Sequence, residues 1–138
     1  MKIRPIILCG GEGTRLWQKS TNNEPKQFIN FGGWNLFEKT LKRIKGPLFD
    51  YPIISTNVKY LKKIKFYLKK NKFNKYRIVL EPAKRNTGPA VLSAAIVPDI
   101  PNKQPLLFLP SDHLLEKNNV FNKNLIKNSK YLNNKNIF

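Results

Sequence analysis

Three glycines stand within four positions of the chain, directly after the apolar residues 6–9. They are Gly10, Gly11 and Gly13. A short continuous apolar run indicates a buried strand, and the glycines allow the backbone to turn sharply at its carboxyl end. Successive backbone N–H groups in such a turn form a concavity that favours anions, and phosphate above all. The residues alone therefore predict a phosphate-binding turn at the end of a strand.

Two cations, Arg15 and Lys26, follow these glycines. Arginine can hold phosphate oxygens in a planar fork, whereas lysine acts as a mobile point charge. Neither common phosphate-binding fingerprint fits the stretch. The Walker pattern requires lysine and Ser/Thr where this chain has Thr14-Arg15, and the dinucleotide pattern requires a third glycine where it has Leu16. On the glycines alone, a tight turn without a ligand is an equally good interpretation.

A carboxylate, Asp112, comes shortly after the apolar residues 105–109, which also indicate a buried strand. A carboxylate at a strand end can hold Mg²⁺ against triphosphate oxygens, because Mg²⁺ favours one or two carboxylates together with phosphate and water. The alternative is that Asp112 caps the turn or the segment that follows. His113 is the sole histidine, and we expect it to pack or orient neighbouring groups rather than to act in catalysis.

A third strand is expected over residues 77–81, and it ends at Glu81. Asn86 and Thr87 follow, at the start of a helix rich in small residues. An asparagine amide offers both a donor and an acceptor to a nucleotide base. Asn-Thr at a helix start is also an ordinary cap, and the two roles are compatible.

Strands are expected over residues 3–9, 52–56, 77–81 and 105–109, with helices between and after them. We expect Asn35 and Asn57 to be N-caps, with Glu38 completing a capping box. Each of the four expected helices has a set of side chains that should face the protein core. In chain order these sets are Phe37, Leu41 and Ile44; Val58, Leu61, Ile64, Tyr67 and Leu68; Ala90, Ala94 and Ala95; and Phe121, Leu125, Ile126 and Leu132. Alternating strands and helices predict a Rossmann-like, doubly wound α/β fold, with a mainly parallel sheet covered by helices on both faces.

Longer motifs extend these local patterns. The sequence Gly-Gly-x-Gly-Thr-Arg-Leu-Trp at residues 10–17, followed by Ser20 and by Pro-Lys-Gln-Phe at residues 25–28, resembles the signature of the sugar-1-phosphate nucleotidylyltransferases. Trp17 and the Pro-Lys-Gln-Phe ending resemble the mannose-1-phosphate guanylyltransferases in particular. The likeness continues in the same order at residues 81–87 and 109–113, so it covers nearly the whole chain.

This resemblance implies transfer of a guanylyl group from GTP to mannose 1-phosphate, with Mg²⁺, giving GDP-mannose and pyrophosphate. It implies catalytic roles for Arg15 and Lys26 and a metal ligand in Asp112. The nucleotide-binding residues that it implies are Gly10, Gly11, Gly13, Thr14, Glu81, Asn86 and Thr87. Two departures from the family pattern, Gln18-Lys19 after the tryptophan and Glu24, bear on the geometry of the loop.

The family domain continues well beyond residue 138, so we expect residues 1–138 to be the amino-terminal, nucleotide-binding part of an incomplete domain. The residues at 136–138 then begin a further strand. A chain of this kind is expected to have weak activity or none. The alternative is a non-catalytic, nucleotide-binding remnant of the family.

The amino-acid composition narrows the possible partners and the cellular location of the protein. Lys and Arg number 26 against 8 acidic residues, a formal net charge of +18, which raises the alternative of a nucleic-acid-binding protein. The lysines are spread through the expected helices without a basic-aromatic module, so we favour solvated helix faces. The single cysteine, Cys9, suits a reducing cytoplasm and is expected to be a core residue. No apolar run or signal pattern indicates a membrane partner, and nothing specifies an oligomeric state.

Overall fold

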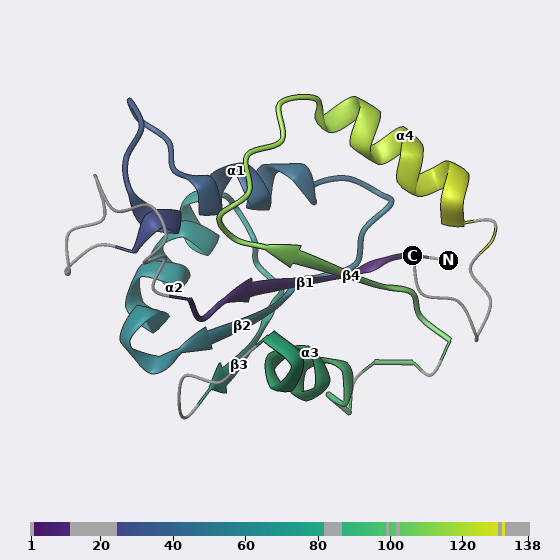
Figure 1. The fold of residues 1–138 in the computed structure, drawn as a ribbon, viewed down its shortest axis with the longest axis horizontal. Coiled ribbons are helices and arrows are strands. Elements are labelled where there is room, and N and C mark those ends of the chain that lie inside the picture. The colour runs from purple at the N-terminus through teal and green to yellow at the C-terminus, as the bar shows by residue number, and fades with distance from the viewer. Residues whose placement is uncertain are drawn as a thin grey trace.

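The computed structural model describes residues 2–11, 25–81, 87–98, 100–101, 103–129 and 131 (Figure 1). In this part of the chain four strands form one sheet: β1 (Arg4–Cys9), β2 (Ile53–Asn57), β3 (Arg77–Glu81) and β4 (Leu106–Pro110). All neighbours are parallel and the spatial order is β3-β2-β1-β4. The first strand therefore lies inside the sheet, and the last strand pairs with it directly.

Helices cover both faces of this sheet (Figure 1). On one face lie α1 (Leu36–Arg43), α2 (Leu61–Lys70) and α4 (Asn118–Ser129), and on the other lies α3 (Thr87–Ala95). Successive strand residues alternate between the two layers: Ile7 and Ile54 pack with the first group of helices, whereas Ile6 and Ile53 pack with Ala94 of α3. The predicted doubly wound α/β fold is confirmed.

The strands are mostly apolar, as is typical of strands that are covered on both faces. The sequence places β3 at its observed bounds, and it places the other three strands to within one residue. The two predicted N-caps are also present. Asn35 Oδ1 accepts a hydrogen bond of 2.8 Å from the Glu38 N–H, and Asn57 Oδ1 accepts one of 3.0 Å from the Lys59 N–H.

Three details of the helices differ from the prediction. The Glu38 carboxylate is buried and lies 2.9 Å from Lys70 Nζ, so it links α1 to α2. Val58 is 63% exposed because it belongs to a 3-10 turn, η2 (Val58–Tyr60), that precedes α2. Ile126 is 51% exposed, since α4 turns Phe121 and Leu125 toward the core instead. Leu132 and the expected strand at residues 136–138 lie outside the described residues.

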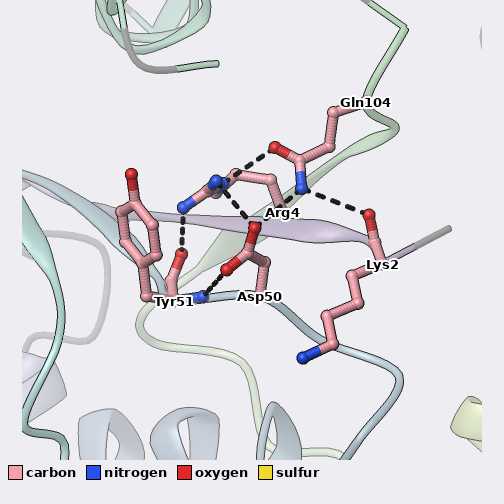
Figure 2. Close-up of polar contacts among 5 residues, drawn as sticks. All are labelled: Lys2, Arg4, Asp50, Tyr51 and Gln104. Atoms are coloured by element: carbon pink, nitrogen blue, oxygen red, sulfur yellow. Dashed lines mark hydrogen bonds and ion pairs between the residues drawn. The ribbon is translucent and has the colours of Figure 1, made fainter. Parts of the chain in front are cut away.

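A cluster of polar side chains lies at the amino-terminal ends of the strands (Figure 2). Arg4 is 3% exposed, and its guanidinium lies 2.7 Å from Asp50 Oδ2 and 3.6 Å from the centre of the Tyr51 ring. Its Nε donates to Gln104 Oε1 at 3.1 Å, and Gln104 Nε2 donates in turn to Asp50 at 2.9 Å. The cluster joins β1 to the segments that precede β2 and β4. It lies at the end of the sheet opposite to the predicted functional residues.

No helix in the described part of the chain is both long and apolar enough to cross a membrane.

Candidate functional site

The candidate site lies at the carboxyl ends of the strands. Gly10 follows β1, Glu81 ends β3, and Asp112 stands two residues after β4. From β1 the chain crosses one face of the sheet to β2, and from β3 it crosses the opposite face to β4 (Figure 1). The sheet order therefore changes direction between β1 and β4, and such a switch point is where open α/β sheets bind ligands.

Lys26 and Asp112 meet at this switch point. Lys26 begins the 3-10 turn η1 (Lys26–Phe28), and its Nζ lies 3.6 Å from Asp112 Oδ2. The side chains are 22% and 36% exposed, so both can reach a ligand from solvent. Phe28 holds the turn in place, because it is 1% exposed and its ring lies edge-on to Phe37 of α1, with centroids 5.7 Å apart. The structure thus brings together a lysine and a carboxylate that the sequence assigns to one site, and their roles stay predictions.

Glu81 and Gly10 form a second contact of the site. Glu81 Oε1 accepts a hydrogen bond of 2.6 Å from the Ser55 hydroxyl in the middle of β2. A Cβ atom added at Gly10 would lie 2.7 Å from Glu81 Oε2, so the carboxylate occupies space that only glycine leaves open. The glycine therefore has a steric role here that is separate from any backbone turn.

The loop that carries Asp112 is held from α1. Arg43 is 2% exposed and donates a hydrogen bond of 3.2 Å to the carbonyl oxygen of His113. Burial lowers the pKa of the Arg43 guanidinium, and its Nε has no hydrogen-bond partner among the described residues. His113 itself is 64% exposed, with Nε2 at 4.0 Å from Asp112 Oδ1. Its backbone, rather than its imidazole, makes the contact that fixes the loop.

The remaining predicted residues are placed in part. Gly11 accepts a hydrogen bond of 3.2 Å at its carbonyl oxygen from Gln27 Nε2. Thr87 begins α3. Four of the predicted site residues lie outside the described residues: Gly13, Thr14, Arg15 and Asn86.

Sequence reasoning missed three residues that support the site: Gln27, Ser55 and Arg43. Gln27 belongs to the Pro-Lys-Gln-Phe motif but received no role of its own. Ser55 interrupts an apolar strand with a hydroxyl near its carboxyl end, which is a usable signal for a polar contact. Arg43 carries no such signal, because a basic residue in the last turn of a helix is ordinarily solvated.

The residues present fit a metal ion that arrives with a ligand. In the described part of the chain no three His, Cys, Asp or Glu side chains gather at one place, so these residues do not enclose a metal by themselves. A single half-exposed carboxylate, complemented by phosphate oxygens and water, is a donor set that suits Mg²⁺. Asp112 supplies that carboxylate.

Comparison with known proteins places this geometry in a family. Residues 4–136 match the family model described as nucleotidyl transferase. The chain belongs to the nucleotidyl transferase family. Over 114 residues it is 38% identical to the alginate biosynthesis protein AlgA of Pseudomonas fluorescens, covering 81% of this chain and 24% of that protein. It is 37% identical over 124 residues to mannose-1-phosphate guanylyltransferase 2 of Escherichia coli O157:H7, covering 86% and 26%.

A solved structure shares the fold of this chain. The nucleotidyl transferase chain superimposes on a Helicobacter pylori structure described as mannose-6-phosphate isomerase, with a TM-score of 0.73 and 28% identity. The match covers 94% of this chain and 46% of the other. The chain thus spans about a quarter of the length of the two relatives named above. The resemblance to mannose-1-phosphate guanylyltransferases is confirmed at the level of the family and its relatives.

Proposed function

We propose that the chain is the nucleotide-binding part of a domain that transfers a guanylyl group from GTP to mannose 1-phosphate, giving GDP-mannose and pyrophosphate. The observation that carries the proposal is the pair formed by Lys26 and Asp112 at the switch point, 3.6 Å apart and open to solvent. A cation and a metal-binding carboxylate on one side of a phosphate-binding turn are the groups that phosphoryl chemistry needs. Two of the relatives' names support the choice of GTP and mannose 1-phosphate.

In this reaction an oxygen of mannose 1-phosphate forms a bond to the α-phosphorus of GTP, and the bond between that phosphorus and the leaving pyrophosphate oxygen breaks. The turn at Gly10 and Gly11, with Gly13 and Thr14, would hold phosphate oxygens through backbone N–H groups. Lys26 and Arg15 would neutralise the charge that grows on phosphate oxygens. Asp112 would hold Mg²⁺, which neutralises and orients the triphosphate when bound.

Glu81 determines the orientation in which the nucleotide would bind. Its carboxylate lies beside Gly10 and would repel a triphosphate from that side of the turn. The same carboxylate accepts hydrogen bonds, and guanine presents N–H donors along one edge. We therefore place the base toward the end of β3, near Glu81, Asn86 and Thr87. The triphosphate then extends toward the ends of β1 and β4, where Lys26 and Asp112 lie.

A second candidate function is nucleotide binding without turnover. It is favoured by the span of the chain, about a quarter of the length of its named relatives. We propose that the 138-residue chain alone binds guanine nucleotide and forms GDP-mannose slowly or not at all. A reducing cytoplasm suits both functions, because Cys9 is a buried free thiol.

The test is calorimetric titration of the purified chain with GTP and Mg²⁺, repeated with UTP and with the Lys26→Ala variant. Saturable binding that prefers GTP and weakens about tenfold in Lys26→Ala, a loss of about 1.4 kcal/mol, is the expected result. Lys65→Ala is the matched control, since Lys65 is exposed on α2 and should leave affinity unchanged. An equal loss in both variants would indicate general attraction by positive charge. No binding by a folded sample would overturn the proposal.

Turnover is measured separately. The purified chain is incubated with GTP, mannose 1-phosphate and Mg²⁺, and GDP-mannose is quantified. Binding without product supports the second candidate. Product formation at a rate abolished by Lys26→Ala supports catalysis by this chain.

A further inference from the structure

Three residues of the candidate site, Gly10, Lys26 and Asp112, share one feature of their neighbours. Each has an adjacent residue in the chain that is buried and carries a group able to form hydrogen bonds. These inward neighbours are Cys9, Gln27 and Ser111, which are 0%, 2% and 4% exposed. They come from three segments: the end of β1, the turn η1 and the residue after β4. At each of the three places, a residue of the candidate site is thus next in sequence to a buried residue that can form hydrogen bonds.

The three inward side chains meet at the Cys9 thiol. Gln27 Nε2 lies 3.9 Å from Cys9 Sγ and also donates a hydrogen bond of 3.2 Å to the Gly11 carbonyl oxygen. The Ser111 side chain is a neighbour of the same thiol, and its interaction with the thiol partly offsets the rise that burial causes in the pKa of Cys9. In addition, the Ser111 N–H donates to the Leu8 carbonyl oxygen at 3.1 Å, which continues the pairing of β4 with β1 past the end of the strand.

We propose that Cys9, Gln27 and Ser111 form a buried polar junction that sets the positions of the glycine turn, Lys26 and Asp112 relative to one another. The part that the junction plays in the reaction rests on the proposed function. Gln27 is its central member, because its amide contacts both the thiol and the backbone of the glycine turn. It is a positioning residue, since it acts through Lys26 and Gly11 and does not itself face the ligand.

The physical argument starts from what cannot hold the site together. An ion pair between partly exposed side chains contributes little, so Lys26 and Asp112 do not fix their own separation. Burying an amide costs free energy unless it is hydrogen-bonded, and an apolar side chain would fill the same space at a lower cost. Hydrogen bonds, unlike apolar contacts, depend on direction. A buried amide at Gln27 therefore fixes the orientation of the segment that carries Lys26.

Cys9 also supplies a reporter for the junction. It is the sole cysteine of the chain, and burial raises the pKa of its thiol to about 12. The thiol reacts as thiolate, so a native, closed junction should resist thiol reagents at neutral pH. Reaction then requires the segments around the thiol to separate.

The experiment compares thiol labelling in wild type, Gln27→Met and Gln104→Met under native conditions. Both substitutions replace a hydrogen-bonded glutamine with an unbranched apolar side chain, but Gln104 lies in the cluster at the opposite edge of the sheet (Figure 2). We expect Gln27→Met to raise the labelling rate about tenfold more than Gln104→Met, as the loss of a buried hydrogen bond implies. Labelling is compared at equal distance below each variant's melting temperature, so that global unfolding contributes equally.

Ser111→Ala is a milder second variant that removes one contact to the thiol and keeps the backbone pairing. It should raise labelling in the same direction, and it keeps the test decisive if Gln27→Met does not fold. Amide hydrogen exchange at residues 25–29 and 110–113 provides a second measurement that does not depend on labelling of the thiol. Faster exchange at both segments in Gln27→Met, without a change at β3, supports the junction. Equal labelling rates in the two glutamine variants would overturn it.

A second experiment tests the junction through nucleotide binding. Bound GTP and Mg²⁺ hold the outward residues, so they should slow thiol labelling in wild type, and Gln27→Met should weaken GTP binding while Gln104→Met should not. If wild type binds no nucleotide, the proposed function fails. The labelling comparison without nucleotide still decides whether the junction positions the three segments.

Discussion

The Ser55 hydroxyl donates a hydrogen bond of 2.6 Å to the Glu81 carboxylate, and this bond joins the middle of β2 to the carboxyl end of β3. The carboxylate lies against the backbone of Gly10, where a Cβ would stand 2.7 Å from Oε2. Three neighbouring strands, β3, β2 and β1, are therefore coupled through one side chain. The position of Glu81 depends on the absence of a side chain at residue 10.

Gly10→Ala should displace the Glu81 carboxylate. The carboxylate ends a flexible side chain, so it should move away from the new methyl group and lose its bond to Ser55. We expect a cost of about 1–2 kcal/mol in the free energy of unfolding, measured with urea. Gly11→Ala is the control, because no atom lies within 4 Å of its added Cβ, and its effect should stay within about 0.5 kcal/mol. Similar losses in both variants would contradict the coupling.

Asp112→Asn should change nucleotide binding in opposite directions with and without metal. In Mg²⁺ the variant loses a charged ligand oxygen, and we expect affinity for GTP to fall about tenfold, or about 1.4 kcal/mol. With EDTA it loses a charge that repels the triphosphate, so affinity should stay equal or rise. Calorimetry measures both. Glu116→Gln removes an exposed carboxylate from the following loop and should show neither effect. A loss of the same size in EDTA would argue against a metal role.

Asp50→Asn should flatten the dependence of stability on pH. Burial alone would raise the pKa of Asp50, but hydrogen bonds from Gln104 and from the Tyr51 N–H, with the charges of Arg4 and Lys2, outweigh it and lower the pKa. A lowered folded-state pKa contributes stability above the unfolded value of about 3.9, and that stability is lost as pH falls through the folded value.

The measurement is urea unfolding of wild type and Asp50→Asn at several values between about pH 6 and pH 3, across the unfolded-state pKa. Wild type should be the more stable above about pH 5, and the difference should shrink toward pH 3. A difference that does not change with pH would show that the Asp50 charge contributes nothing.

Arg43 allows the charge and the packing of one buried side chain to be separated. Arg43→Met removes a buried cation with an unpartnered Nε and keeps most of the volume, so stability should change by no more than about 1 kcal/mol. Arg43→Ala leaves a cavity and should cost about 2–4 kcal/mol more. Urea unfolding compares the two. If Arg43→Met costs as much as Arg43→Ala, the bond to the His113 carbonyl carries the stability instead.

The strands and helix caps could be predicted from the sequence because their signals are local. Continuous apolar runs gave β1 to β4 in the right places, and Asn35 and Asn57 are caps because their side-chain oxygens meet N–H groups two or three residues away. The fold class followed from the alternation of these elements.

Contacts between segments were the part that could not be predicted. The Glu38 carboxylate was assigned to a local capping box, but it contacts Lys70, which belongs to another helix. Ile126 was assigned to the core because its spacing suits a helix, yet spacing does not specify how far α4 is rotated against the sheet. The link between Gln27 and the Cys9 thiol likewise depends on two segments that only the fold brings together.

The pairing of β1 with β4 also determines when the candidate site exists. Arg4 lies opposite Leu106 and Leu8 opposite Pro110, so β1 can pair with β4 only after residue 110 has been synthesised. Such contacts of large sequence separation form slowly during folding. Among the described residues α4 has no buried side chain, which gives the carboxyl-terminal unit a low free energy of local opening. Asp112 keeps its place beside Gly10 and Lys26 through the pairing of β4 with β1, which the Ser111 N–H extends by its bond to the Leu8 carbonyl oxygen. The candidate site is thus assembled only when β4 pairs with β1.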